Sequence, residues 1–249
     1  MLLSNSRGGY SFLQGGRAYS AGVVAASGFT IEHVRFSSTV PWRSGFERID
    51  SHLRAAGRPR AALCAIALRS PAPLSFDGFR EFNAGYAELL ISWDLFVDGV
   101  NPVARTNVAP ELNPPSEPSL YSFAYTVPIP SPRSFLVAGA GELPEGASGA
   151  GDIVRAGETS PDALTEKAHF VAGLIEGRLH GLGADWSEVA VTNIYTIHDV
   201  NGLLRPAILP HIGAAAAHGI NWYYSRPPIL SIEYEVDVRG GTRDFVIPV

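Results

Sequence analysis

The sequence predicts an α+β protein whose strands and helices follow the same order twice along 249 residues. Runs typical of strands alternate with amphipathic helical segments, and the alternation begins again near residue 128. Residues 49–57 and 175–183 also share one pattern: an apolar residue, an acidic residue, leucine at the fifth position and a closing glycine. We therefore expect two tandem lobes, residues 1–127 and 128–249.

The first lobe is predicted from runs of apolar residues and from turn signals. Ser27-Gly28 indicates a turn between two strands, and Gly57 suits the left-handed residue that ends a helix. Residues 62–68 form an uninterrupted apolar run of strand length, and residues 75–91 repeat large apolar side chains every three or four positions. In order, we expect strands at 17–24 and 29–36, a helix at 45–56, a strand at 62–68, a helix at 75–91, and strands at 105–109 and 119–127.

The second lobe is predicted in the same way. Ser160-Pro161-Asp162 is a typical helix start, because proline suits the first turn, and that helix stops near Gly181. Strict alternation of apolar and acidic residues from Ile232 to Val238 indicates a closing strand over residues 230–238. In order, we expect a strand at 134–143, a loop at 144–157, a helix at 160–181, a strand at 188–197, a helix at 202–218, and strands at 220–225 and 230–238.

Composition and missing motifs exclude several classes of protein. The net charge is −5 and no basic run occurs, so we expect no nucleic-acid partner. No apolar run approaches the roughly 18 residues of a membrane span, so we expect a cytoplasmic protein without a membrane partner. Cys64, the one cysteine, lies in an apolar run and is expected to be buried and inert. Because zinc-protease, P-loop, nucleophile-elbow and dinucleotide motifs are absent, we expect no metal and no cofactor.

Polar residues within otherwise apolar elements are the candidates for chemistry. Arg105, at a strand start, could make a surface ion pair or clamp a substrate carboxylate in bidentate fashion. Asn83 interrupts the apolar face of its helix, or is only a surface amide. Glu233 shares one strand face with Glu235 and Asp237, which could simply be the solvated face of that strand, and Glu142 follows Gly141 in a turn.

These residues resemble the motifs of the Rid (YjgF-type) family of imine deaminases, over nearly the whole chain and twice. In the first lobe the matches are Tyr10, the helix segment 82–86 around Asn83, and Val103-Ala104-Arg105-Thr106. In the second lobe, residues 140–144 match the family's Ser-Gly-Gln turn with Ala for Ser and Glu for Gln, and residues 232–235 match its closing strand. The first lobe lacks the closing-strand Glu, and the second lacks the Arg.

The resemblance implies a fold, an assembly and a site. Each lobe would be a mixed sheet with two helices packed on one face, and three chains would form a homo-oligomer. One cleft between lobes would hold Glu233 and Glu142 as catalytic residues. Its substrate-binding residues would be Arg105, Asn83, Gly141, Tyr10 and Tyr125, although Tyr121 could replace Tyr125. The reverse cleft would lack both Arg and Glu.

The function implied is hydrolytic deamination of an enamine or imine carboxylic acid. Arg105 would bind the small carboxylate-bearing substrate, and Glu233 would activate water for attack on the C=N carbon. A dicarboxylate similar to 2-aminomuconate is the expected substrate, because 2-aminomuconate deaminases belong to this family. A chorismate-hydrolysing enzyme and a non-catalytic, ligand-binding trimer are the alternatives.

Overall fold

Twelve strands form one mixed sheet across the residues that the structure, a computed structural model, describes: 1–130, 132–147 and 149–249. The sheet order is β1-β2-β3-β8-β11-β9-β10-β6-β5-β7-β4-β12. The strands are β1 (Leu2–Asn5), β2 (Tyr10–Leu13), β3 (Gly22–Ala25), β4 (Thr30–Pro41), β5 (Leu63–Arg69), β6 (Ala104–Pro110), β7 (Ser119–Val127), β8 (Phe135–Gly141), β9 (Val191–Thr196), β10 (Asn221–Arg226), β11 (Glu235–Gly240) and β12 (Arg243–Ile247). The helices are α1 (Trp42–Ala55), α2 (Phe76–Ser92), α3 (Pro161–Gly181), α4 (Asn201–Leu203) and α5 (Leu209–Ile212).

The middle of the sheet repeats one arrangement in opposite order. From its edge inwards, the second half contributes β8-β11-β9-β10 and the first half contributes β4-β7-β5-β6. In both halves the strand after the first helix pairs in parallel with the strand after the second helix, and antiparallel with the last strand. β10 and β6 then join the halves through an antiparallel pairing. The repeated order of elements predicted from the sequence is therefore confirmed.

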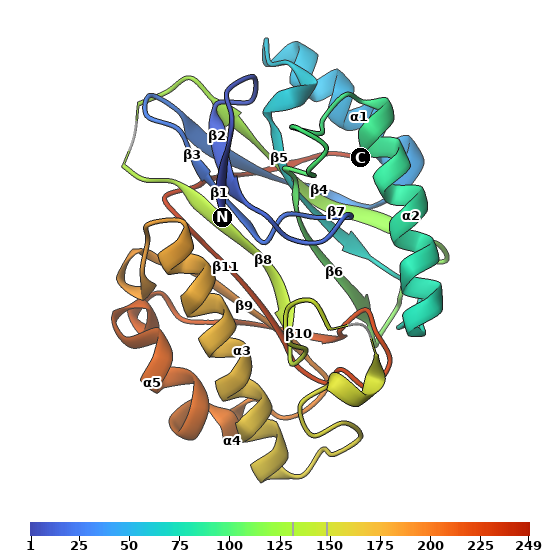
Figure 1. The fold of residues 1–249 in the computed structure, drawn as a ribbon, viewed down its shortest axis with the longest axis vertical. Coiled ribbons are helices and arrows are strands. Elements are labelled where there is room, and N and C mark those ends of the chain that lie inside the picture. The colour runs from blue at the N-terminus through green and yellow to red at the C-terminus, as the bar shows by residue number, and fades with distance from the viewer. Residues whose placement is uncertain (131, 148) are drawn as a thin grey trace.

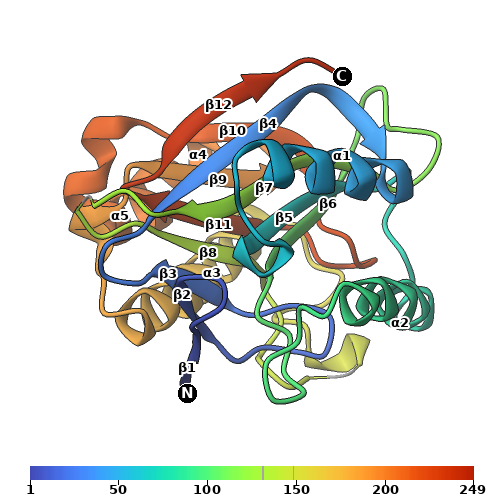
Figure 2. The ribbon, with the colours of Figure 1, turned by 90° about the horizontal axis from the view of Figure 1, so that it is seen from above.

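The two ends of the chain each pair with the opposite half. β3 pairs antiparallel with β8, so the N-terminal strands extend the sheet of the second half. β12 pairs in parallel with β4, so the C-terminal strand extends the sheet of the first half. Figure 2 shows β12 beside β4 on one side of the molecule and β1 on the other. The boundary predicted near residue 128 stays a prediction.

Helices cover the outside of both halves, and the strands lie between them. α1 and α2 lie on one side of the molecule, and α3, α4 and α5 lie on the other (Figure 1). Phe46 and Leu53 of α1 pack with Tyr86 of α2 in the core of the first half, while Ile175 and Val171 of α3 occupy that of the second. A third cluster joins β2 and β3 to the sheet of the first half and contains the fully buried Cys64, whose thiol pKa is raised by burial.

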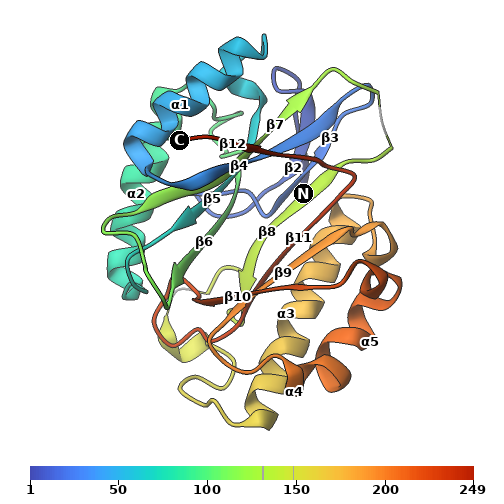
Figure 3. The same cartoon turned by 180° about the vertical axis from the view of Figure 1, so that it is seen from behind.

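Most predicted elements are present, with two clear differences. The helix expected at 202–218 is broken into α4, a π-helical stretch (Leu204–Ile208), α5 and a 3₁₀ segment (Gly213–His218). Pro206 and Pro210 lie in this region, and proline removes a helical hydrogen bond and crowds the preceding turn. β1, β2 and β12 were not expected, although their pairings are regular (Figure 3 shows β12 beside β4 from behind).

The closing strand also begins later than predicted. β11 starts at Glu235, whereas the alternation in the sequence suggested a start at residue 230. Ser231 has a left-handed backbone with φ of 72°, which interrupts an extended chain. The backbone N–H groups of Glu233 and Tyr234 donate to the carboxylate of Glu142. A side chain therefore replaces the neighbouring strand as their partner.

Candidate active site

A cleft of about 130 Å³ lies between the two halves. The first half contributes Tyr19, Phe79, Arg105 and Asn107 to its lining, and the second contributes residues 139–141 and 143–147 with Arg178 and Glu235. We call this space the interlobe cleft. Arg105 and Asn107 reach it from β6 because alternate residues of a strand point to the same side.

Arg105 is a buried cation with an unsatisfied donor. Its side chain is only 4% exposed, and its Nη2 donates to Asn83 Oδ1 at 2.7 Å. Nη1 has no hydrogen-bond partner among the described residues. The rings of Tyr86 and Tyr19 lie 4.9 and 5.4 Å from the guanidinium carbon. Burial lowers the pKa of Arg105, but arginine remains charged in proteins, so the cleft offers an unpaired positive charge to an anion.

Asn107 adds a second unpaired donor two residues further along β6. Its Oδ1 accepts a hydrogen bond from the Ser70 hydroxyl at 3.0 Å, which fixes the orientation of the amide. Its Nδ2 is buried and has no partner among the residues that the structure describes. Buried donors normally have partners, so two unpaired donors on one strand face indicate a place where a ligand with oxygen acceptors binds.

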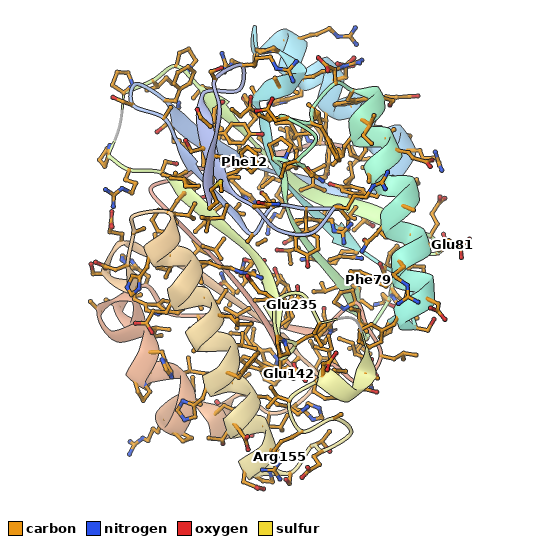
Figure 4. The ribbon with its side chains drawn as sticks, viewed as in Figure 1. Phe12, Phe79, Glu81, Glu142, Arg155 and Glu235 are labelled. Atoms are coloured by element: carbon orange, nitrogen blue, oxygen red, sulfur yellow. The ribbon has the colours of Figure 1, made fainter. Side chains whose placement is uncertain are left out.

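Glu235 brings a carboxyl group to the cleft from the opposite half. It is 5% exposed, and burial together with the nearby Asp237 raises its pKa to about 8, against the opposing effect of Arg105 and Arg178. At neutral pH the acid form therefore predominates. The carboxyl group lies over Gly139, where an added Cβ would collide with Glu235 Oε1. Figure 4 shows Glu235 near the centre of the molecule.

The backbone at the end of β8 joins the two sides of the cleft. The Gly139 N–H donates to Thr106 Oγ1 at 3.1 Å, and the Thr106 hydroxyl donates to Asp237 Oδ2 at 2.9 Å. Gly141 lines the cleft, and a Cβ there would lie 2.7 Å from Ile232 Cγ2. Both glycines therefore allow a close approach that a larger residue would block.

Arg178 lies on the second-half side of the cleft, on α3. Its Nη1 donates to the carbonyl of Ala138 at 3.0 Å, and its Nε donates to Glu145 Oε1 at 2.9 Å. Arg178 was not predicted as a site residue, although the sequence contains a signal for it. It lies three positions after Ile175 and seven after Val171, so it falls on the apolar face of its helix.

The two glutamates predicted as catalytic lie outside the lining of the cleft. Glu142 is fully buried, pairs with Lys167 at 3.0 Å and accepts the two backbone N–H groups that precede β11. Burial raises its pKa, opposed by the Glu233 N–H and by Lys167. Glu233 instead pairs with His198 at 2.9 Å. Glu233 was chosen because residues 232–235 match the closing strand of the Rid-type motif, whereas β11 begins at Glu235, which lines the cleft.

The tyrosines predicted for the site are also placed elsewhere. The Tyr10 hydroxyl donates to the Leu63 carbonyl at 2.8 Å, and the Tyr125 hydroxyl donates to Glu32 at 2.6 Å. Neither lines the interlobe cleft, and Tyr121 lines a different cavity. Tyr19 is the tyrosine of the cleft, and it lies in a segment that the sequence suggested was a strand.

A larger cavity of about 250 Å³ contains Tyr121 and Asp237. The Asp237 carboxylate already accepts hydrogen bonds from Thr106, Asn193 and Tyr195, at 2.7 to 2.9 Å. Its acceptors are therefore satisfied by the protein, whereas the interlobe cleft has unpaired donors. For this reason we place the candidate active site in the interlobe cleft.

No helix among the described residues combines the length and apolar character needed to cross a membrane. Within the same residues, no group of three or more His, Cys, Asp or Glu side chains is arranged to hold a metal ion. The polar groups that line the cleft are guanidinium, amide, carboxyl, phenol and backbone groups. This set can bind carboxylates and transfer protons.

Comparison with solved structures finds only weak likenesses. The solved structure of a chorismatase is 10% identical with a TM-score of 0.48, covering 88% of this chain and 77% of its own. A cyanuric acid hydrolase is 13% identical with a TM-score of 0.44, covering 87% and 69% respectively. Likenesses at this level are too weak to assign a family.

The sequence relationships are much closer. The chain is 42% identical over 246 residues to a 2-amino-5-chloromuconate deaminase of Comamonas testosteroni, and the match covers 97% of each chain. The family model described as 2-aminomuconate deaminase CnbZ matches residues 2–245. A match over nearly the full length, together with this identity, shows that the chain belongs to the 2-aminomuconate deaminase family.

Proposed function

We propose that this chain is a hydrolytic deaminase that releases ammonia from an enamine or imine dicarboxylate of the 2-aminomuconate class. The observation that carries the proposal is that two groups line the same cleft. One is the buried guanidinium of Arg105, which has an unpaired donor, and the other is the carboxyl group of Glu235, whose pKa is raised to about 8. The family of the chain supports the substrate class.

Arg105 and Asn107 anchor the substrate carboxylate beside the reacting carbon. Arg105 Nη1 and Asn107 Nδ2 are the unpaired donors of β6, and carboxylate oxygens are suitable acceptors for both. Asn83 holds the guanidinium in place through its Oδ1. Fixing one end of the substrate in this way orients the neighbouring C–N group toward Glu235.

Glu235 supplies and removes protons. In its acid form Glu235 protonates the carbon end of the enamine. This step converts the substrate to an iminium ion and leaves Glu235 as a carboxylate. The carboxylate then takes a proton from water as the oxygen bonds to the C=N carbon. Glu235 returns this proton to nitrogen and the C–N bond breaks. The Glu235 carboxylate then takes the hydroxyl proton, which gives the ketone and ammonia and restores the acid form of Glu235. One water is consumed, and no step requires a cofactor.

Because the acid form of Glu235 starts the reaction, the pKa of Glu235 sets the expected pH dependence of kcat/KM. We expect kcat/KM to fall as pH rises through about 8, where Glu235 loses its proton. A rate that instead increases through this pH would show that the carboxylate form begins the reaction.

The two halves of the chain share one order of elements, which bears on the resemblance to Rid-type proteins. We propose that each half is a Rid-type lobe, supported by the shared order β4-α1-β5-α2-β6-β7 and β8-α3-β9-α4-α5-β10-β11. The trimer expected from this resemblance is part of the proposal. Light scattering of the purified protein tests it, and a monomer would contradict it.

The decisive experiment compares two nearby glutamates. Ammonia release from freshly generated 2-aminomuconate is measured for the wild type, Glu235→Gln and the matched control Glu233→Gln. We expect Glu235→Gln to lose roughly 100- to 10,000-fold in kcat, as removal of a general acid–base group typically does. We expect Glu233→Gln to stay within about 3-fold, because Glu233 lies outside the lining of the cleft and pairs with His198.

Three outcomes would contradict the proposal. The wild type could release no ammonia, Glu235→Gln could retain full activity, or Glu233→Gln could be the inactive variant. Release of pyruvate from chorismate without ammonia from 2-aminomuconate would favour the chorismate-hydrolysing alternative.

A further inference from the structure

A second guanidinium lines the interlobe cleft and has no part in the proton transfers described above. We infer that Arg178 is the anchor for the distal carboxylate of the substrate, and that Glu145 competes with the substrate for this guanidinium. The inference rests on the proposed function, because it takes the substrate to be a dicarboxylate.

The geometry of Arg178 suits a fixed anchor. Its side chain is 10% exposed, although arginine side chains are usually on the surface. The carbonyl oxygens of Ala138 and Gly139 accept hydrogen bonds from Nη1, so the backbone of β8 holds the guanidinium at one edge. A guanidinium already held by the protein loses little conformational freedom when it binds a planar carboxylate.

Glu145 shows that a carboxylate is accommodated at this guanidinium. Its Oε1 accepts from Arg178 Nε at 2.9 Å, yet its side chain is 57% exposed. It lies in the segment 143–147 that lines the cleft. An ion pair with an exposed partner contributes little net stability, so a substrate carboxylate can replace Glu145 at a small cost. The fully buried pair of Glu142 and Lys167 is the opposite case.

The charges of the cleft match a dianion. Arg105 and Arg178 each carry a positive charge, and both lower the pKa of Glu235, which nevertheless stays protonated at neutral pH. Burying two carboxylates requires two compensating cations, whereas a monocarboxylate bound at Arg105 would leave Arg178 paired with Glu145. Arg105 Nη1 and Asn107 Nδ2 are unpaired donors on the same face of β6, whereas Arg178 is held by Glu145 and by the Ala138 carbonyl. We therefore assign the carboxylate beside the reacting carbon to Arg105 and the distal carboxylate to Arg178.

A purely structural role for Arg178 has a different consequence. If Arg178 only tied α3 to the carbonyls of β8, its removal would weaken all ligands alike. A pair of stable ligands separates the two roles: muconate and sorbate share a six-carbon diene chain and differ in one carboxylate. The preference for muconate over sorbate therefore reports the second anchor alone.

The experiment measures the affinities of muconate and sorbate by calorimetry. The proteins are the wild type, Arg178→Met, Arg178→Lys, Glu145→Gln and the control Arg80→Met, whose side chain is exposed on α2. We expect the wild type to prefer muconate by about 10- to 100-fold, typical of a charge-assisted pair. Arg178→Met should abolish the preference and leave sorbate affinity within about 3-fold. Arg178→Lys should retain part of it, and Arg80→Met all of it.

Glu145→Gln tests the competition separately, because the Glu145 side chain is 57% exposed and its replacement is expected to change stability little. We expect muconate to bind about 3-fold more tightly and sorbate to be unchanged. Equal weakening of both ligands by Arg178→Met, or a wild type without preference, would overturn the inference. If the wild type releases ammonia from 2-aminomuconate but shows no preference, only the second anchor fails; if it prefers muconate but releases no ammonia, only the proposed function fails.

Discussion

The two halves of the molecule share one topology but differ in the residues at equivalent positions. Arg105 of β6 pairs with Ile66, the fourth residue of β5, and Trp222 of β10 pairs with Ile194, the fourth residue of β9. In the same way, Glu235 of β11 lies opposite the fifth residue of β9, and Ser122 of β7 lies opposite the fifth residue of β5. Arg105 and Glu235, the ionisable residues of this comparison, thus have the non-ionisable counterparts Trp222 and Ser122.

Arg178, the third ionisable residue of the cleft, also has a counterpart in the first half, which the repeated sequence pattern identifies. Aligning residues 49–57 with 175–183 places His52 opposite Arg178. His52 contacts the Tyr125 hydroxyl at 3.2 Å, and burial lowers its pKa, so it is uncharged at neutral pH. A duplicated fold can therefore assign binding and proton transfer to one pairing of halves, while the other positions are free to serve packing.

The largest expected effect concerns stability. Among the described ion pairs, only Lys167 and Glu142 have fully buried side chains, and both belong to the second half. Lys167→Met leaves the Glu142 carboxylate buried without its cation, and we expect a loss of about 3–5 kcal/mol in the free energy of unfolding. Urea unfolding followed by circular dichroism measures it.

The matched variant lies on the equivalent helix of the first half. Arg54 of α1 pairs with Asp50 across one turn and is 71% exposed. Arg54→Met should cost less than about 0.5 kcal/mol. Equal losses in the two variants would show that burial does not distinguish the halves in this respect.

We expect the buried carboxyl group of Glu235 to lower the free energy of unfolding, unlike its counterpart Ser122, which does not ionise. Its pKa is about 8 in the folded state and near the ordinary 4.5 in the unfolded state. Between these values the unfolded chain loses a proton that the folded chain keeps, so stability falls as pH rises through this window. Glu235→Gln removes the effect, and we expect a gain of about 3 kcal/mol at pH 7. At pH 4 the two proteins should differ little.

The measurement is the urea midpoint of both proteins at pH 4, 7 and 9. A variant that is less stable than the wild type at pH 7 would mean that the carboxyl group of Glu235 is not destabilised by burial. Glu233→Gln is the control, because Glu233 lies outside the cleft and pairs with His198.

The next largest expected effect is the difference in kcat/KM between variants of Arg105 and of its counterpart Trp222. We expect Arg105→Met to lower kcat/KM by roughly 100-fold, since truncating one side of a buried charge pair costs several kcal/mol. Trp222 is 43% exposed, and Trp222→Met should change kcat/KM by less than about 3-fold. Steady-state ammonia release measures both. A large loss in Trp222→Met would show that the second set of positions also contributes to turnover.

How far the sequence predicts this molecule depends on how local the signal is. Helices α1, α2 and α3 and strands β5 and β7 follow from periodicity and from local signals such as Pro161. Arg105 and Asn83 were predicted together and are in contact. These features depend on short-range patterns, which a single sequence displays.

Features that depend on distant contacts were not predicted. Alternation placed Glu233 and Glu235 on one face, but Glu142, some 90 residues earlier, binds the N–H groups that would otherwise begin the ladder. The pairing of β12 with β4 joins residues about 210 apart, and no local pattern indicates it. Arg178 falls on the apolar face of α3, which is a local signal, but its partner Glu145 lies in a turn 33 residues earlier, and no local pattern indicates that contact.

The smallest expected effect compares one glycine in each of the equivalent helices. A Cβ added at Gly173 of α3 would meet no atom within 4 Å, so Gly173→Ala should stabilise the protein by about 1 kcal/mol through helix propensity. A Cβ at Gly45 of α1 would collide with the side chain of Leu120 on β7, including its Cβ at 3.3 Å. Overpacking outweighs propensity there, and Gly45→Ala should cost about 1 kcal/mol. Thermal unfolding of both variants measures the two changes; changes of the same sign would show that α1 and α3 are packed against their sheets with equal tolerance.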